Sequence, residues 1–377
     1  MTIQTFSFLV PPVVFGVRTA ESISEHLIRM GAKQILVISD RGLEKAGLVE
    51  QLCAWIRKAD VSVTTYTDIE AEPSVHSVRK CVDFARQAGS DLVVGIGGGS
   101  VMDSTKVVAA LLGSPGDILD YLGLNKVPSK GVPTILLPTT AGSGSEMSRG
   151  ALFYVPERQS KEAVFSSNLL TDLALIDPAL ALSAPASVTA ASGLDALCHA
   201  IESYTGLAAN PLSMPFAELG IKWISQYLVP VVTNGSSLES REGMALGCLY
   251  ASIALANANT HAVHALAYPL QGKNRIVHGR ANGVLLPYVL NAIAPDLSEK
   301  LNDIAAWMGL AKGFSVSEGV TSLSRQIGLP TKMSALGVAD SQLDRFTQEA
   351  IQIRRLLDNC PVPLDAAQIK AIYQTAL

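Results

Sequence analysis

The 377-residue chain lacks an excess of basic charge, a cysteine framework and a secretion signal at its amino terminus. Its 29 Lys and Arg residues are outnumbered by 33 Asp and Glu residues, and the formal net charge of −4 offers no basic field for nucleic acid. The five cysteines show no paired spacing, which indicates reduced thiols in a cytoplasmic protein. The first residues, MTIQTFSFLVPP, have neither a basic segment nor a long apolar core, unlike a secretion signal. We therefore expect a small neutral or anionic molecule as the partner.

An apolar stretch suited to a membrane is also lacking. Residues 243–260 form the longest uncharged run, but this run contains glycines and asparagines and leads directly into a histidine-rich segment. We expect it to form a buried core helix and not a membrane span.

The length of the chain exceeds the usual size of one hydrophobic core, so two domains are expected. Short apolar runs alternate with helical stretches up to about residue 180, with strands expected at 35–39, 61–66, 92–96 and 134–137. This alternation is typical of a parallel sheet covered by helices on both faces. The pattern then becomes wholly helical, so we predict an α/β domain over residues 1–180 and an all-helical domain over 181–377.

One carboxylate and three imidazoles form a candidate metal site. Asp195 and His199 lie four residues apart in the helix-forming run SGLDALCHAIESY, which places both side chains on one helix face. His264 lies in a second apolar helical stretch, and His278 follows an irregular segment, which suits a ligand at a loop or helix start. Three nitrogens and one oxygen suit Zn²⁺ or Fe²⁺ and fit neither Ca²⁺ nor Mg²⁺, but the ligands alone do not name the ion.

A single histidine on an apolar helix is more often a core residue with its nitrogens satisfied by neighbours. The chain has only six histidines, however, and three of them fall between His261 and His278, with a fourth next to Asp195 in helical spacing. This concentration favours a metal site over three independent core histidines.

A glycine-rich turn is the second informative region. In VVGIGGGSVMDSTK, an apolar strand runs into Gly97, Gly98 and Gly99, and a helix is expected from Ser100. Glycines at such a junction let backbone N–H groups and the helix N-terminus approach a phosphate, as in a nucleotide pyrophosphate. The motif alone is weak, because the same glycines also serve tight strand-to-helix packing, and it is not the G-x-G-x-x-G fingerprint.

Two further segments are compatible with a dinucleotide. Asp40 follows an early strand, where a carboxylate can accept hydrogen bonds from a ribose and repel a 2′-phosphate, which favours NAD over NADP. Asp is equally favoured as an ordinary helix N-cap, and the two roles are compatible. The loop PTTAGSGSE, residues 138–146, offers small and hydroxyl side chains for a cofactor or substrate, although its composition also describes any loop.

Four segments together resemble the iron-containing (group III) alcohol dehydrogenases, in order and across essentially the whole chain: GGGSVMDSTK, PTTAGSGSEMSR, GLDALCHAIESY and HALAYPLQGKNRIVHGRANGVLLP. The resemblance, whose architecture is shared with dehydroquinate synthase, implies an NAD-binding α/β domain, an all-helical metal domain and catalysis in the cleft between them. It implies Asp195, His199, His264 and His278 as metal ligands, with Fe²⁺ or alternatively Zn²⁺. On the cofactor side it implies Asp40, Gly97, Gly98, Gly99, Ser100, Asp103, Thr139, Thr140 and Lys161. Asp103 and Lys106 are expected to brace the glycine loop.

The chain departs from the family pattern at the expected proton relay. Many members carry a second histidine four residues after the third ligand, and here that position is Tyr268. A phenol with an ordinary pKa of about 10 is a poor base at neutral pH. His261, three residues before a ligand, is the other candidate, with a structural role as its alternative. The catalytic candidates are therefore Tyr268, His261 and Lys161, and the proton path stays open.

The expected function is hydride transfer between NAD(H) and a small primary alcohol or its aldehyde, by a cytoplasmic enzyme that forms a homodimer or larger homo-oligomer. Within the family, maleylacetate reductase and hydroxyacid transhydrogenase activities are alternatives, although the Asp-x3-His and GGGS-x2-D patterns favour the alcohol dehydrogenase branch. A metal-dependent lyase similar to dehydroquinate synthase is a further alternative. Such a lyase needs several cations for a phosphorylated acid, and the metal region offers only Lys273, Arg275 and Arg280.

Overall fold

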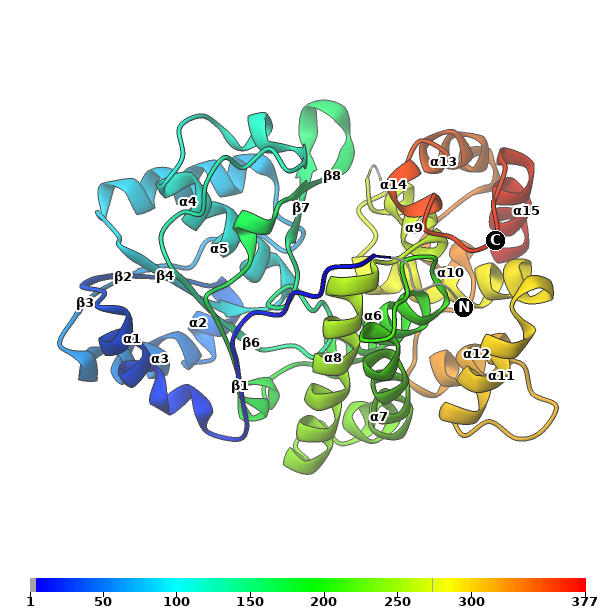
Figure 1. Cartoon of the computed structure of the whole chain (residues 1–377), viewed down its shortest axis with the longest axis horizontal. Helices are drawn as coiled ribbons and strands as arrows, with labels where there is room; N and C mark the ends of the chain where they lie inside the picture. Colours follow the sequence, from blue (N-terminus) through cyan, green and yellow to red (C-terminus); the bar gives the residue numbers. More distant parts are fainter. Residues whose placement is uncertain (1–4, 273) are drawn as a thin grey trace. The chain divides into compact units, whose positions relative to one another are not determined.

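The computed structural model describes residues 5–272 and 274–377, which fold into two compact units. The first, called here the sheet unit, comprises Val10–Thr140 and Ser145–Ala184. The second, the helical unit, comprises the described residues of Pro185–Leu377, together with Ala141–Gly144 and residues 5–9. Figure 1 shows both units coloured along the sequence.

The sheet unit is built on a six-stranded parallel sheet in the order β1-β9-β6-β4-β2-β3. Its strands are β1 (Val13–Phe15), β2 (Gln34–Ile38), β3 (Ser62–Tyr66), β4 (Leu92–Gly97), β6 (Thr134–Pro138) and β9 (Leu173–Ile176). The helices between them are α1 (Ile23–Met30), α2 (Arg41–Lys45), α3 (Leu48–Ile56), α4 (Val75–Gln87) and α5 (Gly99–Leu112). The four strands expected from sequence all form, within a residue or two at each end.

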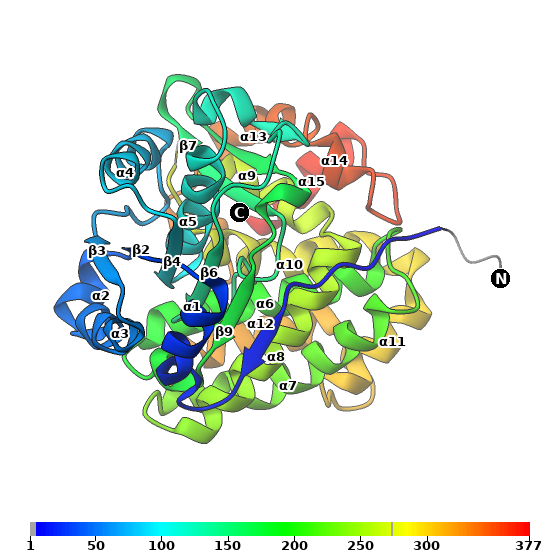
Figure 2. The same cartoon turned by 60° about the vertical axis from the view of Figure 1, so that its left-hand side comes forward.

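Both faces of the central strands are buried, because alternate side chains of β2, β4 and β6 enter different cores. Leu36 and Val93 pack with α4 and α5, whereas Ile35 and Val94 pack with α1 and α3. Figure 2 shows these two pairs of helices on opposite sides of the sheet. The predicted parallel sheet with helices on both faces is confirmed. Its strands are continuous apolar runs because helices cover both faces.

A second, three-stranded sheet in the order β5-β8-β7 was not expected from the sequence. Its strands are β5 (Gly123–Leu124), β7 (Gly150–Val155) and β8 (Ser160–Phe165), and β7 and β8 form an antiparallel hairpin. The turn between them passes through Gln159, whose φ is 49°. The side chains of β7 alternate between buried and half-buried, which is the periodicity of a one-sided strand and differs from the apolar runs of the parallel sheet.

In its described residues, the helical unit packs ten α-helices around one hydrophobic core. The first three, α6 (Ala186–Thr205), α7 (Ser213–Thr233) and α8 (Leu238–Ala258), pack against one another. The remaining helices are α9 (Ala262–Gln271), α10 (His278–Ile293), α11 (Ser298–Trp307), α12 (Val316–Gln326), α13 (Leu343–Ala350), α14 (Arg354–Leu357) and α15 (Ala366–Ala376). No strand follows β9 in the described part of the chain, so this half is all-helical, as predicted.

The uncharged run at 243–260 lies almost entirely within α8, most of whose residues are buried in this core. No helix among residues 5–272 and 274–377 combines the length and the apolar character that a membrane crossing requires. All five cysteines are buried thiols.

Candidate metal and cofactor sites

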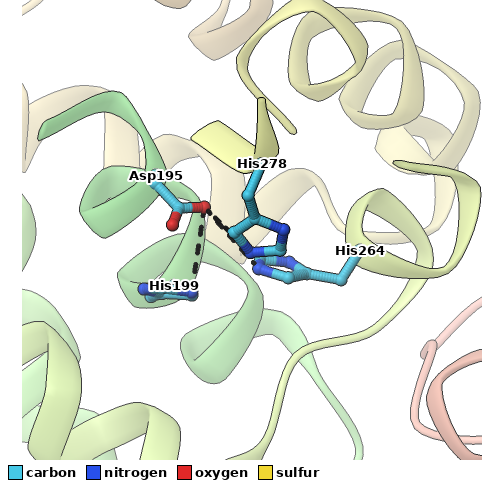
Figure 3. A group of neighbouring side chains, drawn as sticks. All are labelled: Asp195, His199, His264 and His278. Atoms are coloured by element: carbon cyan, nitrogen blue, oxygen red, sulfur yellow. Dashed lines mark ion pairs between the residues drawn. The ribbon is translucent and has the colours of Figure 1, made fainter. Parts of the chain in front are cut away.

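Three helices of the helical unit bring the four predicted metal ligands together. Asp195 and His199 lie one turn apart on α6, His264 lies in the first turn of α9, and His278 is the first residue of α10. One nitrogen or oxygen atom of each side chain lies within 4.8 Å of the corresponding atom of the other three. Figure 3 shows the four side chains directed toward a common point.

One oxygen of Asp195 lies at nearly equal distances from the three imidazoles. Oδ1 of Asp195 lies 3.8 Å from Nε2 of His199, 3.8 Å from Nε2 of His264 and 3.7 Å from Nε2 of His278. An ion held tetrahedrally at about 2.1 Å from each donor separates the donors by roughly 3.4 Å. The distances from Asp195 to the three imidazoles therefore exceed those of a tetrahedral site by only about 0.4 Å.

The partners of two imidazoles fix which of their nitrogens face the site. Nδ1 of His264 lies 2.5 Å from the carboxylate of Glu202, and Nδ1 of His278 lies 2.7 Å from Oε1 of Gln271. Both partners are acceptors, so each Nδ1 carries the proton and each Nε2 presents a lone pair toward Asp195. Lone pairs and a carboxylate that converge in a buried space repel one another unless a cation joins them. The donor chemistry thus fits a bound metal ion.

Burial and neighbouring charges act in opposite directions on Asp195. Burial by itself raises the pKa of Asp195, but the imidazoles of His278, His199 and His264 and the amide of Asn282 outweigh it and hold the pKa below its ordinary value. Burial also lowers the pKa of His199. A carboxylate and a neutral imidazole are the forms that bind a metal.

Asn282 contacts this donor set and was not identified from the sequence. Its Nδ2 donates to Oδ1 of Asp195 at 2.7 Å and lies 3.0 and 3.1 Å from Nε2 of His264 and His278. Its Oδ1 is buried without a hydrogen-bond partner. Asn282 lies four residues after His278 on α10, so helical spacing from a predicted ligand was the signal that could have found it.

Glu202, also absent from the predicted site, lies fully buried behind His264. Its two oxygens accept from Nδ1 of His264 and from the backbone N–H of Val263 at 2.7 Å. Burial by itself raises the pKa of Glu202, but His261, His264 and these hydrogen bonds outweigh it and lower the pKa. Glu202 is three residues beyond His199 on α6, again in helical spacing with a ligand.

The catalytic candidate His261 lies against Glu202. Its Nδ1 is 3.2 Å from Oε1 of Glu202, and its Nε2 is 2.8 Å from the hydroxyl of Thr205. The His261 ring is buried, and burial lowers its pKa. Its closest polar partners are therefore a carboxylate and a hydroxyl on α6.

Tyr268, the other catalytic candidate in this unit, is half-buried on α9, one turn after His264. A four-residue step places its side chain on the same helix face as that ligand. Of the three cations that a lyase would use, Arg275 is exposed and Arg280 is half-buried, while Lys273 lies outside the described residues.

The glycine loop of the sheet unit joins β4 to α5 as predicted, with the helix beginning at Gly99. A Cβ at Gly97 would lie 2.5 Å from a methyl of Val101, so this glycine is required for close strand-to-helix packing. A Cβ at Gly98 would meet only the Thr140 side chain, at 3.5 Å. Gly98 and the first N–H groups of α5 are therefore the part of the loop best suited to a phosphate.

Asp40 lies at the same edge of the sheet as the glycine loop. It follows β2, which pairs in parallel with β4, and the hydroxyl of neighbouring Ser39 donates to the carbonyl of Ile96 at 2.8 Å. Oδ1 of Asp40 accepts from the backbone N–H of Gly42 at 2.8 Å and of Leu43 at 3.1 Å. Asp40 is thus the N-cap of α2, and its other oxygen is not required by the cap.

Asp103 and Lys106 are buried on α5 and connect it to the segment that precedes β7. Asp103 accepts from the Ser145 hydroxyl at 2.5 Å and from the Leu152 N–H at 2.8 Å. Nζ of Lys106 lies 3.2 Å from Asp103 and donates to the carbonyls of Ser145 and Gly150. Burial lowers the pKa of Lys106. Both side chains are engaged by the segment before β7 and by β7 itself, so their role beside the glycine loop stays a prediction.

The remaining cofactor candidates surround the same loop. The N–H of Thr139 donates to the carbonyl of Gly97 at 2.9 Å, and Thr140 lies beside Gly98. The hydroxyl of Ser100 accepts from the backbone N–H of Glu72 at 3.2 Å, and the carboxylate of Glu72 pairs with Lys161. Ser100 and Lys161 are therefore linked through one residue, a relationship that the sequence did not reveal.

Comparison with known families and proteins gives matches to both halves of this chain. A family model described as iron-containing alcohol dehydrogenase matches residues 11–178, and the model of the C-terminal part of the Fe-containing alcohol dehydrogenase family matches residues 189–377. Long-chain-alcohol dehydrogenase 1 of Geobacillus thermodenitrificans is 40% identical over 359 residues, which cover 92% of this chain and 90% of that protein. NAD-dependent methanol dehydrogenase of Bacillus methanolicus is 32% identical, with 92% and 93% covered.

The solved structures agree with the sequence relatives. A crystal structure of 1,3-propanediol oxidoreductase, 32% identical, matches with a TM-score of 0.94 over 99% of this chain and 100% of that chain. The family resemblance expected from the four motifs is confirmed. The chain therefore belongs to the iron-containing alcohol dehydrogenase family.

Proposed function

We propose that this protein is an NAD-dependent alcohol dehydrogenase that uses a divalent metal ion to interconvert a small primary alcohol and its aldehyde. One observation carries the proposal: three imidazoles and a carboxylate from α6, α9 and α10 converge with their lone pairs facing one another. Asp195, His199, His264 and His278 are the proposed ligands, Fe²⁺ is the proposed ion, and Zn²⁺ suits the same donors.

A divalent ion at this position supplies Lewis acidity, which favours ionisation of an alcohol and polarises a carbonyl. The helical unit contributes the geometry. Glu202 and Gln271 keep His264 and His278 in the tautomer whose Nε2 faces the site, and Asn282 holds the carboxylate of Asp195 by one oxygen. Fixed side chains of this kind lose little freedom when substrate binds.

NAD(H) supplies the hydride acceptor or donor. We assign its binding to residues 1–180 and the metal to residues 181–377. Gly98, Gly99, Ser100 and the N-terminus of α5 would bind the pyrophosphate, and the free oxygen of Asp40 would accept from the ribose. Thr139, Thr140 and Lys161 line the same loop, with Gly97 providing close packing and Asp103 the brace.

The proton path is proposed to include Tyr268, which lies one helical turn beyond His264. A phenol can pass a proton along a hydrogen-bonded chain without being a strong base itself. His261 is assigned a structural role, because its closest partners are Glu202 and Thr205.

The proposed substrate class is broad in chain length. The names of the relatives cited above refer to long-chain alcohols, methanol and 1,3-propanediol, so membership of the family does not define the length of the substrate. The five buried thiols suit the reducing cytoplasm, where we place the protein, and we expect it to self-associate as a homo-oligomer.

The decisive experiment strips the metal, reloads the protein anaerobically with Fe²⁺ or Zn²⁺, and follows NADH consumption with aldehydes of increasing length. We expect no turnover without metal and restored turnover with Fe²⁺. His264→Ala should lose metal and turnover while retaining NADH binding. His76→Ala, the same change at a half-exposed histidine paired with Glu157, should retain all three. Bound metal with no NADH consumption on any aldehyde, hydroxyaldehyde or keto acid would overturn the proposal and favour a lyase.

A further inference from the structure

The carboxylate of Glu202 is fully buried behind the proposed metal ligand His264. Glu202 of α6 reaches α9 through both oxygens: Oε2 lies 2.5 Å from Nδ1 of His264 and Oε1 accepts from the N–H of Val263 at 2.7 Å. His261 lies against Oε1 from the other side at 3.2 Å. The carboxylate therefore has little freedom to turn away from His264.

His264 on α9 and His278 on α10 differ in their own exposure and in the charge of the residue that their Nδ1 faces. His264 is nearly buried and faces the carboxylate of Glu202, whereas the side chain of His278 is 22% exposed and faces the neutral amide of Gln271. An anionic acceptor forms a stronger hydrogen bond with an imidazole N–H than a neutral one does, and it increases the electron density on the opposite nitrogen.

We infer that Glu202 is a positioning residue for the metal site: it selects the His264 tautomer whose Nε2 is free to bind the ion, and it strengthens that nitrogen as a ligand. The inference rests on the proposed metal-dependent function and extends it to a residue outside the four ligands. In this role Glu202 acts on the ion through His264.

Glu202 has a competing role as a structural link, since it accepts from the first turn of α9. Glu202→Gln separates the two roles. The amide oxygen of Gln can still accept from the Val263 N–H, which directs its NH₂ toward Nδ1 of His264. Because two donors cannot face each other, His264 must then adopt the tautomer protonated at Nε2, the nitrogen that binds the ion. The link to α9 survives, but the ligand is blocked.

The experiment compares wild type, Glu202→Gln and Gln271→Leu as full-length, metal-stripped proteins. Co²⁺ and Zn²⁺ affinities are measured by competition with a chelator, and ring nitrogen shifts are recorded after ¹⁵N-histidine labelling, since the chain has only six histidines. The His264 signals are assigned by their loss in His264→Gln. We expect Glu202→Gln to weaken metal binding by roughly 10- to 100-fold and to shift His264 toward the Nε2-protonated form. Gln271→Leu should weaken binding by less than about threefold, because it removes only a neutral acceptor from Nδ1 of His278.

Three results would overturn the inference: an unchanged His264 tautomer in Glu202→Gln, metal affinity within about threefold of wild type, or an equal loss in Gln271→Leu. A lower melting temperature of metal-stripped Glu202→Gln with unchanged metal affinity would likewise assign Glu202 to structure alone. Failure of the proposed function has a different signature. Wild type would then bind no metal or show no metal-dependent NADH turnover, whereas the tautomer measurement on metal-stripped protein would still report on Glu202 and His264.

Discussion

The amide nitrogen of Asn282 lies 2.7 Å from Oδ1 of Asp195, the same oxygen that all three imidazoles face. Without an ion, this amide is the donor that Asp195 receives from α10. Asn282 therefore supports the carboxylate of Asp195 in the metal-free protein. Introducing a charge at position 282 should lower stability more without metal than with it.

Asn282→Asp places a second carboxylate beside Asp195. Like charges at this distance repel, so we expect the metal-free variant to melt at a lower temperature than wild type, and the increase in melting temperature on adding Zn²⁺ to be larger. The deficit should shrink as the pH falls, because the paired carboxyls can then share a proton. Thermal melts with and without metal at several pH values test this.

The control for this prediction is Asn168→Asp, the same change at an amide that donates to the carbonyl of Val127 in the sheet unit. It should lower stability equally with and without metal. Equal metal-dependent shifts in Asn282→Asp and wild type would show that residue 282 does not influence Asp195.

Asp40 has two roles that different substitutions separate. Asp40→Ser keeps a hydroxyl to cap α2 but removes the charge that repels a 2′-phosphate, so we expect kcat/KM with NADPH to rise relative to NADH without loss of stability. Asp40→Ala should relax the preference equally and also cost about 1 kcal/mol of stability. Steady-state kinetics with both cofactors and urea unfolding give the two readouts.

The matched control is Asp365→Ser, at the N-cap of α15 in the helical unit, where the side chain accepts from Gln368 N–H. Its cofactor preference should be that of wild type. An undiminished preference for NADH in Asp40→Ser would remove the ribose assignment and leave Asp40 as a helix cap.

The parts of this structure that were predictable from sequence are those set by local periodicity. Asp195 and His199 are four residues apart in an uninterrupted helical run, so their shared face follows from helix geometry alone. The strands that end near Asp40 and Gly97 are continuous apolar runs, which is the pattern of a buried parallel sheet. The β7–β8 hairpin was missed because its two strands give different signals. The side chains of β7 are apolar but alternate between buried and half-buried, whereas β8 is mostly half-buried and carries Lys161 and Glu162.

Residues whose role depends on packing between helices were not predictable in the same way. Nothing in the local sequence marks the three supporting residues Glu202, Gln271 and Asn282 as part of a site. Their contacts with the ligands arise only where α6, α9 and α10 meet. Helical spacing nevertheless contained a signal. Glu202 lies three residues after His199, and Asn282 four residues after His278, so polar residues one turn from an expected ligand are candidates to support it.

Tyr268 occupies the position of the expected proton relay, one turn after His264. We expect Tyr268→Phe to lower kcat by roughly 100-fold, as for loss of a general acid–base group, with unchanged metal content. Tyr250→Phe removes the same hydroxyl from a residue on α8 that packs near Phe216, and should leave kcat unchanged. A normal kcat with an unaltered pH–rate profile in Tyr268→Phe would exclude the phenol from the proton path.

We expect the buried carboxyl group of Glu146 to make the stability of the protein depend on pH. Burial raises its pKa from the ordinary value of 4.5 to about 7, so between these pH values the folded protein holds a proton that the unfolded chain has released. Stability should therefore fall as the pH rises through this range. Glu146→Gln removes the titration, and we expect the variant to gain stability over wild type from pH 5 to pH 8, by up to roughly 3 kcal/mol. Melting temperatures of metal-loaded proteins across this range provide the test. Parallel curves would show that nearby Lys106 already keeps Glu146 ionised in the folded protein.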